Sequence, residues 1–257
     1  MTALTLLRLL LVPAAVWLAS LAARRWGHAV SGYLGGLPLI GGPITLYLAL
    51  DHGTEFAARA ATLTLAAILG QAAHLLVFAH GARRWRWPAA LVAGWSSFAL
   101  VAIPMAWLPL TPGTGLLLAA AGLALAWRFL PRPRDEATLP AIPAAELRLR
   151  LAAALALAMI ILWSAAAVGP VVSGVLLSVP ITGSIMPPFA LALYGSDAVA
   201  RLARGFVVGL CGFTAFFFVI AAGVVSLGIA IAFVAAIFAA LAALFVASRI
   251  PGTGEFR

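Results

Sequence analysis

A segment of about 55 residues occurs twice in this chain, without gaps, at a fixed offset of 142 positions. Between positions 27 and 81, sixteen of the 55 residues are identical to the residue 142 positions later. Shared Ala or Leu means little in apolar sequence, but the matches also include Gly, Pro, Ser and Arg. We interpret them as an internal duplication, whose period is far too long for a solenoid or a propeller. The informative pairs are Ser31/Ser173, Gly32/Gly174, Pro38/Pro180, Gly41/Gly183, Gly53/Gly195, Arg59/Arg201 and Gly70/Gly212, and Glu55 is matched by Asp197.

The composition places this duplicated sequence in a lipid bilayer. The 257 residues are 65% hydrophobic and 9% charged, with a mean hydropathy of +1.13, which leaves too little polar surface to cover a soluble globule. The net charge of +9 comes from arginines in short segments between apolar runs, where anionic lipid headgroups are the natural partners. This distribution argues against nucleic-acid binding. The lack of Lys beside abundant Ala suggests a bacterial source, and hence the bacterial inner membrane.

Two further features narrow the class of protein. The single cysteine, Cys211, lies in an apolar run, which excludes an intrachain disulfide and a metal cluster built from thiols. The apolar N-terminal run is interrupted by Arg8 and has no basic region before it, so we interpret it as a spanning helix and not as a signal peptide.

Apolar runs long enough to cross about 30 Å of hydrocarbon predict an all-α integral membrane protein with about nine transmembrane helices. Within the long apolar run from Gly205 to Ser248, only Gly223, Ser226 and Gly228 offer turn chemistry. The predicted helices cover residues 3–22, 29–50, 58–80, 88–108, 113–130, 149–168, 170–194, 203–222 and 225–248.

The arginines predict the orientation of these helices. If connections alternate between the two sides of the membrane, one side collects fourteen of the sixteen arginines and the other has only Arg8 and Arg59. The positive-inside rule then makes the Arg-rich side cytoplasmic, with the N-terminus in the periplasm and the C-terminus in the cytoplasm. The fourteen are Arg24, Arg25, Arg83, Arg84, Arg86, Arg128, Arg132, Arg134, Arg148, Arg150, Arg201, Arg204, Arg249 and Arg257.

The same count predicts how the two copies are related. The second copy starts five helices after the first, and an odd number of crossings reverses direction, so the repeats are expected to be inverted. Residues 1–110 would form repeat 1, residues 111–147 a connector helix with a cytoplasmic linker, and residues 148–257 repeat 2, together making one structural unit. The segment at residues 132–150 is the only long polar stretch.

The second helix of each repeat carries a cluster of Gly and Pro near its middle, at residues 35–43 and 180–188. Proline lacks an N–H donor and glycine loses the most backbone entropy in a helix, so both helices are expected to be broken at membrane depth. Paired interruptions in two halves are typical of the binding site of secondary transporters. We expect the following half-helices to start near Pro43 and Pro187, with N-termini that favour an anion or a strongly polar group.

The predicted solute site therefore lies between these two helices. Hydroxyl groups there have two open interpretations, since they can contact a solute or bond back to their own helix. Gln71 and His74 share one helix face and correspond to Phe213 and Phe216 in the second copy, so the symmetry is broken there. No acidic residue lies in the middle of a predicted span, which favours an anionic or neutral solute. The candidate binding residues are Pro38, Gly41, Gly42, Pro43, Thr45, Gln71, His74, Pro180, Thr182, Gly183, Ser184 and Pro187.

Acidic and arginine residues recur at the ends of the second helix in each repeat. Their main expected role is structural, since an acid in the first turn offsets the helix dipole and pairs with an arginine one turn later. A gating role at each mouth is the alternative. A metal site from Asp51, His52 and Glu55 has suitable atoms but no established spacing, and we predict no metal, cofactor or catalytic residue. The gating candidates are Asp51, Glu55, Arg59, Asp197 and Arg201.

These observations predict a small bacterial inner-membrane transporter or facilitator for an anionic or polar small solute. A homodimer is a further expectation. Two other classes remain open: a membrane-embedded enzyme acting on lipid-linked substrates, for which Asp51, His52 and Glu55 are the only acid/base cluster, and a non-catalytic subunit of a larger membrane assembly.

Overall fold

The computed structural model describes residues 3–134, 145–153, 155–156 and 179–249, and side chains are described from residue 14 onward. All regular structure in these residues is helical. Residues 145–153 and 155–156 are also helical. The other helices are α1 (Ala3–Gly36), α2 (Gly41–His52), α3 (Thr54–Ala66), α4 (Ile68–Gly81), α5 (Trp87–Met105), α6 (Pro112–Phe129), α8 (Ile181–Leu227) and α9 (Ile229–Ser248).

The helices identify a membrane protein by their length and apolar character. Six stretches of the described residues are long and apolar enough to cross a membrane. In α8 and in the α3–α4 stretch, 67% and 72% of the most apolar window is buried, against 22% in each of α5, α6 and α9. The outer helices instead expose large apolar side chains, such as Leu100, Leu117 and Phe238. Apolar side chains on the outside of the bundle suit contact with lipid.

Two of the long helices are bent at a glycine and fold back on themselves. Gly27 divides α1 into a first arm (3–26) and a second arm (28–36), and Gly195 divides α8 into a first arm (181–194) and a second arm (196–227). The duplicated pair Gly53 and Gly195 has nearly the same backbone conformation, with φ of 88° and 82° and ψ of 168° and −176°. This positive φ is accessible to glycine at little cost, so the matched glycines mark matched hairpins.

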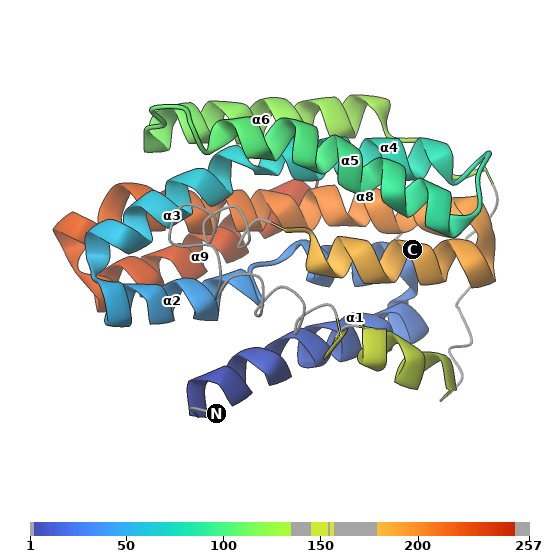
Figure 1. Ribbon diagram of the computed structural model, residues 1–257, viewed down its shortest axis with the longest axis horizontal. Helices are drawn as coiled ribbons and strands as arrows, with labels where there is room; N and C mark the ends of the chain where they lie inside the picture. Colours follow the sequence, from blue (N-terminus) through green and yellow to red (C-terminus); the bar gives the residue numbers. More distant parts are fainter. Residues whose placement is uncertain (1–2, 135–144, 154, 157–178, 250–257) are drawn as a thin grey trace.

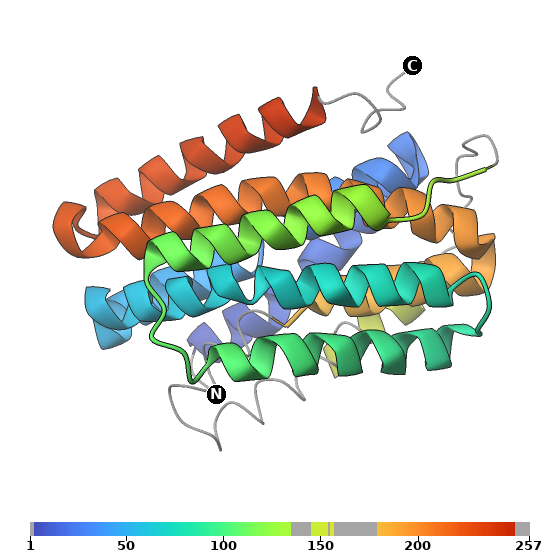
Figure 2. The same ribbon diagram turned by 90° about the horizontal axis from the view of Figure 1, so that it is seen from above.

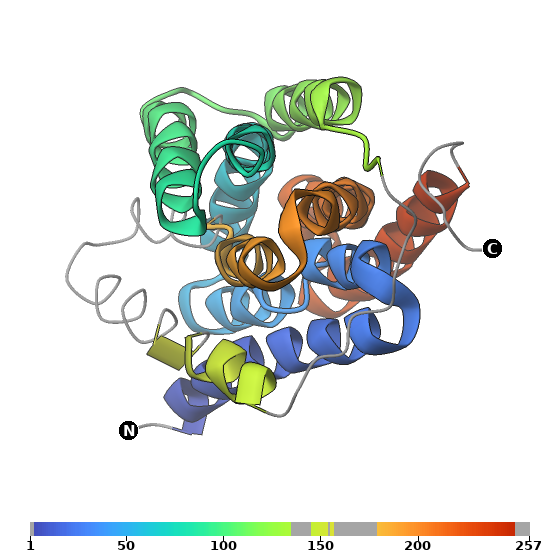
Figure 3. The same cartoon turned by 90° about the vertical axis from the view of Figure 1, so that its right-hand side faces the viewer.

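Consecutive helices turn back at alternate ends of the bundle (Figure 1). The α2–α3 and α8–α9 hairpins lie at the left end, whereas the bends within α1 and within α8 lie at the right end. From above, α6 lies along α4 and α8 (Figure 2). In the end-on view, α3, α4, α8 and the second arm of α1 lie at the centre, with α5, α6, α9 and the first arm of α1 around them (Figure 3).

Several arginine segments meet at the right-hand end of Figure 1. Arg83 donates from Nη2 to the backbone oxygen of Arg132 at 3.0 Å, and Arg204 donates to the backbone oxygen of Leu130 at 3.3 Å. The backbone N–H of Arg134 donates to Asp197 at 3.1 Å. These bonds tie the α4–α5 turn, the chain after α6 and the bend of α8 together at one end.

The second arm of α1 packs directly on the second arm of α8, backbone against backbone. A Cβ added at Gly32 would overlap the backbone at Leu202 and Phe206, and one added at Gly205 would overlap the backbone of Ala29. Further along, a Cβ added at Gly36 would overlap the backbone of Phe206 and Leu210. The contact moves forward along both arms together, so they run in the same direction. Small residues allow this close approach, as in other membrane helix pairs.

Some predicted boundaries were wrong. The helix predicted at 203–222 is the second arm of α8 and begins at residue 196, because the turn is made at Gly195. Of the three residues with turn chemistry in the last apolar run, Gly228 makes the turn, with φ of 76°. Most of the predicted 149–168 helix, the first part of the 170–194 helix and most of the 132–150 linker lie outside the described residues.

Candidate functional site

The first of the two predicted interruptions lies between α1 and α2. The second arm of α1 ends at Gly36 and α2 begins at Gly41, so Leu37 to Ile40 connect two helical segments. The carbonyl of Pro38 accepts the N–H of Gly42 at 2.8 Å, which satisfies one of the first donors of α2. Pro43 is the third residue of α2 and not its first, so the predicted start near Pro43 was two residues late.

The start of α2 is surrounded by aromatic rings. A Cβ at Gly41 would lie 3.1 Å from the ring of Phe217, and one at Gly42 would lie 3.3 Å from the ring of Phe216. Beside the interruption is a cavity of about 360 Å³, lined by Leu37, Pro38, Leu39, Gly42, Pro43, Leu46, Phe216, Phe233, Ile237, Ala240 and Leu241. Every one of these side chains is apolar. The α2 start is therefore an apolar environment, although its backbone dipole favours negative charge.

The start of α8 is the counterpart in the second copy. The helix begins at Ile181, directly after Pro180, and continues through Pro187 and Pro188. The predicted start near Pro187 was therefore wrong by six residues. Thr182 is buried, and its methyl group faces Gly35 of the α1 second arm, where a Cβ would approach it to 3.1 Å. The interruption predicted within residues 180–188 was also wrong, because these residues form a continuous helix from Ile181 onward. The residues before position 179 lie outside the described residues.

Two predicted hydroxyl donors bond to their own helices. Thr45 donates to the carbonyl of Gly41 at 2.8 Å, and Ser184 donates to the carbonyl of Pro180 at 2.7 Å. Of the two interpretations that the sequence left open for these side chains, the bond back to the helix is the one present in this structure.

His74 joins the two copies across the start of α8. It is fully buried, and its Nε2 lies 3.2 Å from the carbonyl oxygen of Gly183. In a helix that carbonyl would accept the N–H of residue 187, but residue 187 is proline and has no N–H. Since a carbonyl can only accept, His74 must carry a proton on Nε2 and donates it to the oxygen that Pro187 leaves without a donor.

In the first copy, the matching carbonyl, that of Gly41, receives its donor from its own helix. The positions that match Gly183, Pro187 and His74 are Gly41, Thr45 and Phe216. Thr45 has both a backbone N–H and a hydroxyl, and the hydroxyl donates to Gly41, so no donor is required from the position of His74. His74 and Pro187 are thus one paired difference between the copies. This pairing gives a physical reason for the broken symmetry seen in the sequence.

Gln71 lies one turn before His74 on the same helix and is also buried, at 5% exposure. The two side chains add polar groups to the core near the start of α8. At the start of α2, the matching Phe213 and Phe216 contribute only rings. The polar part of the predicted site is thus on the α8 side.

The gating candidates lie at the ends of the bundle, away from both helix starts. Glu55 and Arg59 form an exposed pair at 3.8 Å, and Asp51 accepts the Tyr47 hydroxyl at 2.9 Å. His52 lies 3.4 Å from Asp51, while Glu55 pairs elsewhere. In the second copy Asp197 binds the backbone of Arg134. Within the described ranges, no group of three or more His, Cys, Asp or Glu is arranged to hold a metal.

One polar cluster was missed by the sequence analysis. Glu146 and Arg150 lie one helical turn apart on the segment that begins at residue 145, and both are buried. They contact Ser20 of α1 and Tyr194 of α8. Two signals in the sequence pointed here: the i, i+4 spacing of acid and arginine, and the position of Arg150, which is 142 residues after Arg8.

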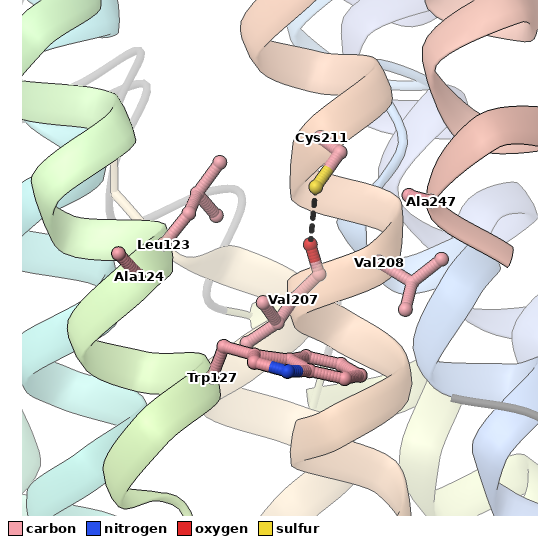
Figure 4. A pocket seen from close by; sticks show the side chains of 7 residues that line it. All are labelled: Leu123, Ala124, Trp127, Val207, Val208, Cys211 and Ala247. Atoms are coloured by element: carbon pink, nitrogen blue, oxygen red, sulfur yellow. Dashed lines mark hydrogen bonds between the residues drawn. The ribbon is translucent and has the colours of Figure 1, made fainter. Parts of the chain in front are cut away.

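A second cavity, of about 200 Å³, lies between α6, α8 and α9 (Figure 4). Trp127 and Leu123 form one wall and Val207, Val208 and Ala247 the other. Among the residues that line this cavity, the Cys211 thiol donates a hydrogen bond to the carbonyl of Val207 at 3.4 Å. This cavity has the apolar character of a lipid-facing groove.

Fold and surface together define a polytopic helical membrane protein with a small set of buried polar groups. No family model matches the chain, and no curated protein or solved structure matches it.

Proposed function

We propose that this protein is a secondary transporter or facilitator for a small polar or anionic solute, built from two inverted four-helix repeats around a connector helix. The solute site lies where α2 and α8 begin, and its polar part is formed by His74, Gln71 and the first turn of α8. The protein resides in a bacterial inner membrane, with the arginine-rich end in the cytoplasm, as the positive-inside rule requires.

A reciprocal pair of contacts between the copies carries this proposal. His74 of the first copy contacts Gly183 of the second at the start of α8. At the start of α2, the matching Phe216 of the second copy faces Gly42, next to the matching Gly41. A contact and its mirror between two fragments is the signature of a twofold relation, here within one chain. An approximate twofold axis between the two helix starts supports a shared site there.

The directions of the helices support the same architecture. Ser20 of α1 lies beside Met186 of α8, and the first arms of both helices end at the bends on the right-hand side of Figure 1, so these two arms run parallel. The segment of the first copy that matches it is α2, which ends at the left-hand end of Figure 1, whereas the first arm of α8 ends at the right-hand end, so the two run in opposite directions. Matched segments that run in opposite directions favour inverted repeats.

A swelling assay with proteoliposomes tests the proposal. Purified protein is reconstituted, the vesicles are mixed with formate, acetate, nitrate, glycerol or urea, and light scattering follows solute entry. We expect at least one solute to enter faster than in protein-free vesicles. The Gln71→Phe variant, which copies the residue at the matched position, should lower that rate roughly tenfold or more through the loss of a buried polar group. His80→Phe changes a helical residue on the exposed surface and should leave it unchanged.

The proposal is wrong if no solute enters faster than in the protein-free control. That result is expected for an enzyme of lipid-linked substrates or for a non-catalytic subunit. If Gln71→Phe and His80→Phe lower the rate of solute entry equally, the polar site between the helix starts is not where the solute binds.

A further inference from the structure

The cavity between α6, α8 and α9 is a groove with apolar walls. Both α6 and α9 pack on α8, and the cavity of about 200 Å³ lies between them. Val207, Val208 and Ala247 are its buried lining, whereas Ala124 at its rim is exposed. In Figure 4 the Trp127 ring extends from α6 toward α8 across one end of the cavity. A hydrocarbon chain is therefore a suitable occupant of this groove.

Each of the three helices that line the groove also carries an arginine near the same end of it. Arg128, Arg204 and Arg249 lie within four residues of a lining residue in α6, α8 and α9. Both α6 and α9 run toward the right-hand end of Figure 1, and the second arm of α8 runs away from it. Because the first two arginines follow the lining residues of their helices and Arg204 precedes those of α8, all three lie at the right-hand end of the groove.

Arg204 is held beside the groove by groups that carry no negative charge. Its guanidinium lies over the Trp127 ring, 4.8 Å from the ring centre. Its Nη1 donates to the carbonyl of Leu130 at 3.3 Å, which is the hydrogen bond that this side chain makes within the described residues. A guanidinium has five N–H donors, so further donors are available to an oxyanion.

The arginines beside the groove have no acidic partner among the described residues. Neither α6 nor α9 contains Asp or Glu, and the one acid in the second arm of α8, Asp197, accepts the backbone N–H of Arg134. None of the three arginines forms an ion pair with a described carboxylate. Arg132 lies close enough to Arg204 for the two charges to repel. Positive charge at this end of the groove favours an anionic partner.

We propose that this groove binds an anionic phospholipid such as phosphatidylglycerol. One acyl chain lies between α6 and α9 on Val207 and Val208, and the phosphate oxygens accept hydrogen bonds from Arg204, with Arg128 and Arg249 beside it. A phospholipid joins a hydrocarbon chain to a negative phosphate, the two features that the groove and its arginines match. Basic pockets between transmembrane helices on the cytoplasmic side bind such headgroups, and the arginine-rich end is the one proposed to face the cytoplasm.

This site is separate from the helix starts beside His74. Lipid binding in the groove does not require that the protein moves a solute, so a failure of the swelling assay leaves it standing. Loss of lipid binding would in turn leave the proposed transport untouched.

Native mass spectrometry of the purified full chain in a neutral detergent tests the site. The protein is titrated with phosphatidylglycerol or with phosphatidylcholine of the same acyl chains, and the Kd of the first bound lipid is determined. We expect phosphatidylglycerol to bind about tenfold more tightly. Arg204→Gln should weaken phosphatidylglycerol binding about fivefold and leave phosphatidylcholine binding nearly unchanged, because one arginine near an anionic headgroup contributes about that factor. Arg204→Lys keeps the charge and should retain most of the preference.

A second variant tests the apolar part of the groove. Ala124→Trp fills the groove from its exposed rim and should weaken the binding of both lipids. Two matched controls should bind lipid as wild type does. Arg84→Gln removes an exposed arginine from the α4–α5 turn at the same end of the bundle, and Val92→Trp adds a ring at a position of α5 that is 66% exposed.

The proposal is overturned if the two lipids bind wild-type protein equally, if Arg84→Gln lowers the preference as much as Arg204→Gln, or if Ala124→Trp binds lipid normally. Displacement of phosphatidylglycerol by excess inorganic phosphate at constant ionic strength would assign the arginines to a soluble anion and would overturn it too. Should Arg204→Gln fail to fold, Arg128→Gln/Arg249→Gln decides, since both side chains are exposed. The double variant should lower the preference, and an unchanged preference overturns the lipid site.

Discussion

At the scale of single residues, one contact in the core follows from a backbone carbonyl whose helical donor is missing because of a proline. Pro187 deprives the Gly183 carbonyl of its donor, and His74 supplies one from another helix. In hydrocarbon or a tight core an unpaired carbonyl is expensive, so His74 and Pro187 depend on each other. The bond also fixes the His74 proton on Nε2. His74 therefore acts as a structural donor through Nε2, and this nitrogen is not free to contact a solute.

Exchanging the two residues for those of the other copy tests this dependence. His74→Phe leaves the Gly183 carbonyl unpaired and should lower the free energy of unfolding by about 1–3 kcal/mol. Pro187→Thr restores a backbone donor, so His74→Phe/Pro187→Thr should be more stable than the sum of the single changes predicts. Denaturant unfolding of the purified variants measures the coupling. Simple additivity would contradict the pairing, and His80→Phe serves as the exposed control.

At the scale of helices, hairpin geometry is set by single glycines with positive φ. Gly53 and Gly195 adopt the same conformation at matched positions, and Gly27 and Gly228 make the other one-residue turns. The Gly53/Gly195 match was visible in the sequence, and it marks a hairpin in each copy. Gly27 lies in the connection predicted between the helices at 3–22 and 29–50, and the structure narrows that connection to this one residue.

Alanine substitution at the matched hairpins should have matched effects. A Cβ at Gly53 or Gly195 would meet nothing within 4 Å, so the only penalty is the backbone conformation. Gly53→Ala and Gly195→Ala should each destabilise the protein by about 1–2 kcal/mol, because an L-residue resists positive φ. Gly113→Ala, in an open helical position, should be neutral or slightly stabilising. Thermal unfolding compares the three, and a neutral effect at either hairpin would refute this reasoning.

At the scale of the whole molecule, the sequence predicted a helical membrane protein, and the structure confirms that class. Local patterns such as apolar runs and Gly/Pro clusters were sufficient for the helical class and for the interruption before Gly41, but the nine predicted spans were not confirmed, since six stretches of the described residues are long and apolar enough to cross a membrane. They were not sufficient for the Glu146–Arg150 pair, because its burial depends on how α1 and α8 enclose a segment distant in sequence. The exact helix starts were also missed, since proline at Pro187 is tolerated once His74 replaces the lost donor.

Cysteine labelling tests the orientation of the whole bundle. In a Cys211→Ser background, Arg84→Cys in the α4–α5 turn and Gly113→Cys in the first turn of α6 place exposed thiols on opposite ends of the bundle. A membrane-impermeant maleimide should label Gly113→Cys in intact spheroplasts and Arg84→Cys only in inverted vesicles, as the positive-inside rule predicts. Labelling of both from the same side would refute the alternating arrangement, and reversed labelling would refute the assigned orientation.

The backbone contact of Gly32 with the second arm of α8 restricts how this molecule can move. No rotamer change can relieve a contact between two main chains, so the second arms of α1 and α8 are expected to move as one rigid unit. Sliding of one of these arms along the other is blocked by the same contact. Larger motions of the bundle are therefore expected in the flanking α5, α6 and α9, of which only 22% of the most apolar window is buried in each.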